Sequence, residues 1–101
     1  MNDYELSPEA VEDLVNIQEF VSADSALAAE RLIEEFFSAF EHLAAWPRSG
    51  HTRRDLTSKA VLVWPVGSYL VVYHLRNSDK RVQIVAVLVA ARDVPAILEE
   101  R

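Results

Sequence analysis

The chain has 101 residues, of which half are apolar, and its 16 acidic and 10 basic side chains give a formal net charge of −6. This length predicts one compact domain over residues 1–101, with a core large enough to fold without disulfides or a structural metal. The net negative charge argues against a protein that coats nucleic acid, because phosphate binding depends on positive charge.

The two parts of the chain carry opposite charge. Residues 1–46 contain eleven acidic residues and one basic residue, Arg31, whereas residues 47–101 contain five acidic and nine basic residues. The first part therefore has a formal charge of −10 and the second a charge of +4. One small domain is expected to present surfaces of both signs.

The sequence lacks the features of several protein classes. Without cysteine the chain has no disulfide framework, thiolate nucleophile or cysteine-ligated metal centre. Its first residues lack the basic and apolar regions of a signal peptide. The longest apolar runs, 60–66 and 84–91, are too short to span a membrane. A cytoplasmic protein is expected.

The first part of the chain predicts a short extended segment, 3–6, followed by two helices. Ser7 and Pro8 supply a cap and a first helical residue, and apolar residues follow helical spacing to about Ser22. A second cap at Ser25 precedes a helix that must stop at Trp46, because the proline that follows disfavours helix there. The apolar stripe of this helix consists of Ala29, Leu32, Ile33, Phe36, Phe37, Phe40, Leu43 and Ala44. We interpret the stripe as core packed on a sheet rather than as a partner-binding face.

After the polar segment 47–59, the period of apolar residues changes from 3.6 to 2, which is typical of strands. Strands are predicted at 61–66, 69–76 and 81–89, with turns between them. Asp93 caps a last short helix, 94–100. The order β-α-α-β-β-β-α predicts an α+β domain in which an N-terminal helical hairpin packs on one face of a small antiparallel sheet.

Conventional catalytic and metal sites have little support in the sequence. His42, His51 and His74 do not stand at metal-ligand spacings, and two glycines are too few for a glycine-rich phosphate loop. Acidic helix residues such as Glu30 and Glu34 are interpreted as a solvated face rather than as a catalytic pair. No metal and no cofactor are expected.

Basic residues gather in the predicted sheet half: Arg48, Arg53, Arg54, Lys59, Arg76, Lys80, Arg81 and Arg92. If some converge on one surface, they can bind RNA phosphates or an acidic protein surface. Otherwise they form a solvated set that balances the acidic helices. Tyr69 and Tyr73 point to the same side of one strand, where they offer a stacking platform or contribute to packing.

Four motifs follow one another along nearly the whole chain. They are Leu6-Ser7-Pro8-Glu9-Ala10 with Asp13-Leu14, then Pro47-Arg48-Ser49-Gly50 with Arg53, then Pro65-Val66-Gly67-Ser68-Tyr69, and finally Val87-Leu88-Val89-Ala90-Ala91-Arg92-Asp93. Together they resemble the RelE/ParE superfamily, the toxins of type II toxin–antitoxin systems, which includes plasmid stabilisation proteins. The fold of that superfamily has the element order derived above.

The resemblance implies one of two activities. RelE-like members are ribosome-dependent ribonucleases that cut mRNA, and their sites are basic because charge develops at phosphate. Here that site would use Arg53, Arg54, Tyr73 and Arg92. ParE-like members inhibit DNA gyrase and are not known as enzymes.

Two positions favour the gyrase inhibitor over the ribonuclease. The chain has Leu62 and Val89 where the ribonuclease pattern commonly has arginine and histidine. The net charge also suits the ribosome poorly, because RNA phosphate repels acidic helices. A third possibility is a degenerate homologue that binds an antitoxin without being toxic.

Either branch implies a cognate antitoxin, ParD-like or RelB-like, that covers an apolar groove and often the basic residues. We expect it to dock on the first helix and on exposed sides of Val61, Val63, Leu70 and Val72. Further candidate residues for binding the antitoxin or the target are Arg92 and Asp93. No membrane partner is expected, and no sequence-specific DNA binding by the toxin alone.

Overall fold

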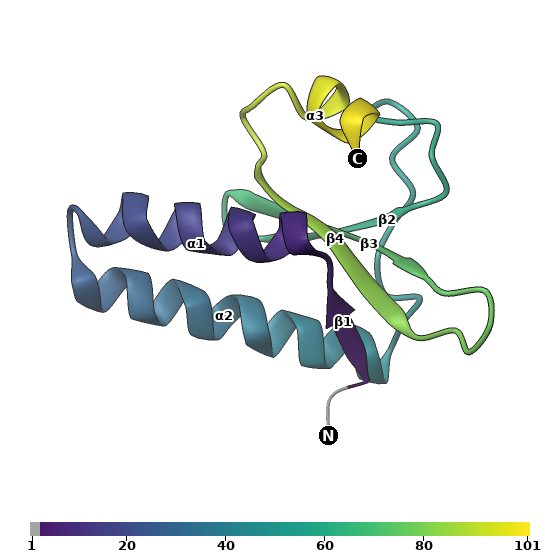
Figure 1. Ribbon diagram of the computed structural model, residues 1–101, viewed down its shortest axis with the longest axis horizontal. Helices are drawn as coiled ribbons and strands as arrows, with labels where there is room; N and C mark the ends of the chain where they lie inside the picture. The colour runs from purple at the N-terminus through teal and green to yellow at the C-terminus, as the bar shows by residue number, and fades with distance from the viewer. Residues whose placement is uncertain (1–2) are drawn as a thin grey trace.

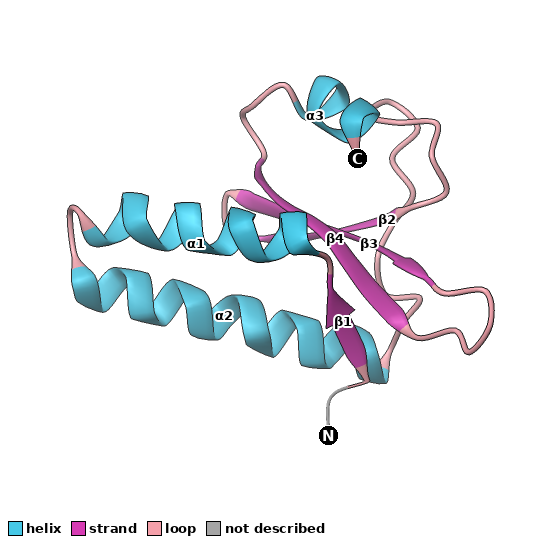
Figure 2. Cartoon of the chain, viewed as in Figure 1, coloured by secondary structure: helices cyan, strands magenta, loops and turns pink. Residues whose placement is uncertain are grey.

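The computed structural model describes residues 3–101 and contains a four-stranded sheet and three helices (Figure 1 and Figure 2). Across the sheet the strands are β1 (Tyr4–Leu6), β4 (Val82–Val89), β3 (Tyr69–Leu75) and β2 (Leu62–Val66). The helices are α1 (Pro8–Ser22), α2 (Ala26–Ala45) and α3 (Val94–Glu100). The predicted element order and the α+β class are confirmed.

Side-chain caps fix where the first two helices begin. Ser7 Oγ accepts a hydrogen bond from Ala10 N at 3.0 Å, and Ser25 Oγ accepts one from Ala28 N at 3.1 Å. Each cap satisfies an N–H group that has no partner within its helix. α2 ends one residue before Trp46, which has a non-helical backbone as expected of a residue that precedes proline.

The sheet is mixed rather than wholly antiparallel. β2, β3 and β4 are antiparallel neighbours as predicted, whereas β1 lies parallel to β4, with Leu6 opposite Ile84. The chain leaves β1 through the hairpin of α1 and α2, crosses to the far edge of the sheet, and returns through β2 and β3. As a result, β4 runs parallel to β1 where the two strands pair.

α1 and α2 lie side by side on one face of the sheet (Figure 1). The core between them and the sheet contains Phe36, Phe40 and Leu43 from α2, together with Tyr4 and Tyr73 from the strands. Tyr4 and Phe40 pack with their ring centroids 5.6 Å apart. The interpretation of the α2 stripe as core therefore holds for these residues.

α3 covers the opposite face of the sheet. Val63, Leu70 and Val72 are buried beneath Val94 and Leu98, and the half-buried Val61 joins the same cluster. The expectation that Val61, Val63, Leu70 and Val72 present exposed sides is therefore wrong for Val63, Leu70 and Val72, whereas Val61 is half-buried. The sequence of α3 predicts a helix from its cap, but seven residues are too few to predict from the sequence which face of the sheet the helix covers.

A bulge interrupts β4 where it faces β3. Tyr73 pairs with Ile84 whereas Val72 pairs with Ala86, so that Val85 is an extra residue in the ladder. The bulge changes which face the following residues point to: Ile84 belongs to the core beneath the helical hairpin, and Ala86 to the core beneath α3.

Side chains from distant segments satisfy the backbone at this bulge. The carbonyl of Val85 accepts a hydrogen bond from Arg101 Nη1 at 3.2 Å, and the N–H of Val87 donates to Asp13 Oδ2 at 3.0 Å. Asp13 and Arg101 are themselves joined by two charged hydrogen bonds of 2.9 and 3.0 Å. On the other side of α3, Lys59 Nζ donates to the carbonyl of Leu98 at 2.6 Å. These contacts fasten α3 to both α1 and the loop before β2.

Candidate functional site

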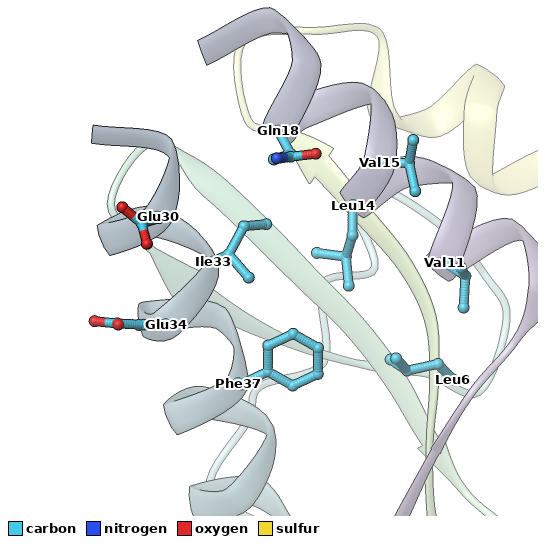
Figure 3. Close-up of a pocket in the computed structure, with 9 residues that line it drawn as sticks. All are labelled: Leu6, Val11, Leu14, Val15, Gln18, Glu30, Ile33, Glu34 and Phe37. Atoms are coloured by element: carbon cyan, nitrogen blue, oxygen red, sulfur yellow. The ribbon is translucent and has the colours of Figure 1, made fainter. Parts of the chain in front are cut away.

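An apolar groove between α1 and α2 is the candidate functional site. It encloses about 460 Å³. Its lining residues are Leu6, Val11, Leu14, Val15, Gln18, Glu30, Ile33, Glu34 and Phe37. Figure 3 shows Leu14, Ile33 and Phe37 directed into the space between the two helices, with Glu30 and Glu34 along the α2 side.

The groove presents apolar surface that the fold leaves uncovered. Val11, Val15 and Phe37 keep 45%, 47% and 37% of their surface exposed. A contiguous exposed apolar patch with polar residues at its rim is typical of a binding surface. A trough between two helices suits an amphipathic segment, which places its apolar side chains in the groove and its polar side chains at the rim.

The apolar stripe of α2 was predicted to be core, and for Phe37 that prediction is wrong. Successive residues of a helix point about 100° apart, so Phe36 and Phe37 cannot both face the sheet. Phe36 is fully buried on the sheet, and Phe37 lines the groove. Leu14 and Val15 are divided in a similar way, with Leu14 buried and Val15 exposed. Two adjacent apolar residues on each helix were the signal that a second apolar face exists.

The four residues of the ribonuclease hypothesis do not form one site in this structure. Arg53 pairs with Asp55 at 2.8 Å in the exposed loop before β2, and Arg54 follows it in the chain. Arg92 is exposed in the loop before α3, and α3 lies between these two loops in Figure 1. Tyr73 is completely buried. The structure therefore places these candidates in three different environments.

Tyr73 has a structural role that its sequence position did not reveal. Its hydroxyl donates to the carbonyl of Pro47 at 2.7 Å and accepts from the N–H of Gly50 at 2.9 Å. Burial raises the pKa of this hydroxyl above its ordinary value. A Cβ on Gly50 would lie 2.6 Å from the Tyr73 oxygen, so a glycine is needed for the close approach. Packing is thus the correct interpretation of Tyr73, and a stacking platform is wrong.

The remaining candidate residues lie at or beneath α3. Asp93 accepts a hydrogen bond from Ala96 N at 3.4 Å as the cap of α3. Val61, Val63, Leu70 and Val72 pack in the core that α3 covers, so a docking role for them stays a prediction and requires α3 to move.

No group of three histidine, aspartate or glutamate side chains in residues 3–101 is placed to hold a metal ion. Within the same residues, no helix has both the length and the apolar character needed to cross a membrane.

Comparison with known proteins identifies one family. A family model described as the ParE toxin of type II toxin-antitoxin system, parDE, matches residues 4–94. The match runs from the first residue of β1 to the first residue of α3, so it includes the groove and the whole sheet. No curated protein matches the chain.

Proposed function

Since the chain belongs to the ParE toxin family of type II toxin–antitoxin systems, we propose that it inhibits DNA gyrase in the cytoplasm and is neutralised by a cognate antitoxin. The proposed activity is inhibition by binding, without a chemical step of the toxin's own. Plasmid stabilisation is the cellular role that such a pair serves.

The groove between α1 and α2 is the observation that carries the antitoxin part of the proposal. Its exposed apolar side chains make a surface that is costly in water and that a partner segment would cover. Glu30 and Glu34 at its rim favour a segment that has basic residues beside its apolar face. Antitoxin binding would stabilise the toxin by mass action.

The state of the ribonuclease candidates supports gyrase inhibition over mRNA cleavage. A basic ribonuclease site needs several cations around one phosphate. Here Arg53 is paired with a carboxylate, Tyr73 is buried, and Leu62 stands where the ribonuclease pattern commonly has arginine.

A supercoiling assay tests the target. Purified protein added to gyrase and relaxed plasmid is expected to block the appearance of supercoiled product, while a cell-free translation reaction continues at its normal rate. Arrested translation with cleaved mRNA and normal supercoiling would replace this proposal with the ribonuclease. No effect in either assay would indicate a non-toxic homologue.

A substitution in the groove tests the antitoxin site. Val15→Glu places a charge among apolar side chains, and we expect it to weaken binding to the antitoxin encoded beside the toxin by at least about tenfold. Phe20→Glu is the matched control, because Phe20 is an exposed apolar residue of the same helix that does not line the groove. Equal affinities of the two variants would place the antitoxin elsewhere.

A further inference from the structure

A second surface with different chemistry lies around the loops that join α2 to β2 and β3 to β4. Two hollows there, of about 500 and 370 Å³, share Arg48, Leu75 and Lys80 among their lining residues and so form one continuous surface. We call this surface the basic face and define it by Trp46, Arg48, Arg54, His74, Leu75 and Lys80. In Figure 1 these loops lie on the right of the molecule, whereas the tip of the helical hairpin lies on the left.

The cations of the basic face are available to a partner. In residues 3–101 no carboxylate lies within ion-pair distance of Arg48, Arg54 or Lys80, whereas the nearby Arg53 and Arg76 are both paired. Neither hollow has an aspartate or glutamate among its lining residues. Three uncompensated cations around one depression attract an acidic partner.

Trp46 adds an apolar anchor at one end of this surface. It is 65% exposed, and Pro47 and Leu75 line the same hollow. The other tryptophan, Trp64, is instead stacked on His42 with ring centroids 5.0 Å apart. Exposed tryptophan beside arginine is the composition that dominates binding energy at protein–protein interfaces.

We propose that the basic face binds an acidic protein surface on the toxin's target, with carboxylates against Arg48, Arg54 and Lys80 and an apolar side chain against Trp46. The proposal rests on the proposed function, in which that target is gyrase. An acidic protein fits better than a nucleic acid, because three cations neutralise few phosphates and the apolar part of the hollow would contribute little to a polyanion. The same apolar part gives a protein partner area to bury.

Neutralising substitutions test this assignment without disturbing the fold. The double variant Arg54→Gln/Lys80→Asn removes two charges, and asparagine tolerates the left-handed backbone of residue 80, where φ is 59°. Arg31→Gln is the matched control, since Arg31 is an exposed arginine of α2. We expect the double variant to bind gyrase at least about tenfold more weakly than wild type, and the control to bind as wild type does. Trp46→Ala should weaken binding by a similar factor.

Antitoxin affinity separates loss of the surface from loss of the fold. Both basic-face variants should retain wild-type affinity for the antitoxin, because none of residues 3–101 lines both the groove and the basic face. Gyrase binding by the double variant that equals wild type would overturn the proposal, and so would a parallel loss of antitoxin binding.

A second arm keeps the basic face testable if gyrase is not the target. If wild-type protein does not bind gyrase, the proposed function fails. The protein is then titrated with polyglutamate and, separately, with a single-stranded oligothymidine. The indole N–H signals of its tryptophans are followed by NMR in both titrations. Movement of the Trp46 signal with polyglutamate, lost in the double variant, supports an acidic protein partner. Tighter binding of oligothymidine, or no movement with either probe, overturns it.

Discussion

A single hydroxyl group holds the start of the loop that carries the basic face. Tyr73 projects from the central strand β3 and bridges the carbonyl of Pro47 and the N–H of Gly50. Both backbone groups follow α2 directly, where the chain has left the helix and has no sheet partner yet. Trp46 and Arg48, which flank Pro47, therefore depend on Tyr73 for their position.

Removing this hydroxyl should cost stability. Tyr73→Phe is expected to lower the free energy of unfolding by about 1–3 kcal/mol, because two backbone groups lose their hydrogen-bond partner at a part-buried site. Urea unfolding followed by circular dichroism measures the change. Tyr69→Phe is the control, since no hydrogen bond of the Tyr69 hydroxyl is found in residues 3–101, and it should stay within about 0.5 kcal/mol of wild type. Equal losses in the two variants would contradict the role given to Tyr73.

Because this hydroxyl is buried, we expect the protein to lose stability at alkaline pH. Burial raises the pKa of Tyr73, and burial together with the charge of Glu41 raises that of Tyr4, above the ordinary value of 10.0. Below that pH both the folded and the unfolded protein keep these protons, and the free energy of unfolding has its full value. Above it the unfolded chain releases them first, so the free energy of unfolding falls as pH rises.

Thermal unfolding between about pH 8 and 11 tests this linkage. The midpoint of wild-type protein should fall more steeply above about pH 10 than that of Tyr73→Phe, which has lost one of the two groups. Parallel curves for the two proteins would show that Tyr73 does not contribute.

At the scale of elements, α3 is held by side-chain contacts at its C-terminal end rather than by its own length. Seven residues bury Val94 and Leu98, while Lys59 bonds the carbonyls of the last turn and Arg101 joins Asp13. Because Asp13 also accepts from Val87 N, the ion pair connects α1, the β4 bulge and the end of α3. The side chains of Asp13 and Arg101 are mostly buried, which strengthens their interaction relative to a surface pair.

Arg101→Ala should therefore loosen α3 without unfolding the domain. Loss of charged hydrogen bonds predicts amide exchange in α3 and at Val87 that is about tenfold to hundredfold faster than in wild type. Hydrogen exchange followed by NMR measures this residue by residue. Arg92→Ala is the control, because Arg92 is an exposed arginine on the other side of α3 for which no ion pair with the described residues is found. Unchanged exchange in Arg101→Ala would show that apolar contacts alone hold the helix.

The elements that depend on local signals were predictable from the sequence. Ser7 and Ser25 mark the helix starts, and Gly67 marks the turn between β2 and β3, where its φ is +57°. The face covered by α3 and the bulge at Val85 were not predictable, because both depend on contacts between residues far apart in the chain. The groove was predictable only in part. The adjacent residues Phe36 and Phe37 indicate that α2 has two apolar faces, but only the packing of α1 on α2 shows that the two helices form a groove.

At the scale of the whole molecule, a structure measuring 40 × 33 × 21 Å carries two surfaces that suit different partners. The groove is apolar with a glutamate rim, and the basic face has uncompensated cations beside an exposed tryptophan. The glutamates of the groove come from the acidic part of the sequence, residues 1–46, and the cations of the basic face come from the basic part, residues 47–101. A toxin built this way can present one surface to its antitoxin and another to its target.

This arrangement predicts that salt separates the two binding events. Raising the salt concentration from about 0.05 to 0.5 M shortens the screening length from more than 10 Å to a few ångströms, which weakens charge pairing and leaves apolar burial intact. Binding to gyrase through the basic face should therefore weaken by about tenfold or more, while antitoxin binding in the groove should change by less than about threefold. Calorimetric titrations of both partners across this range measure the two dependences. The same salt dependence for both partners would mean that they share one surface, and a stronger dependence for the antitoxin would mean that it, rather than the target, covers the basic face.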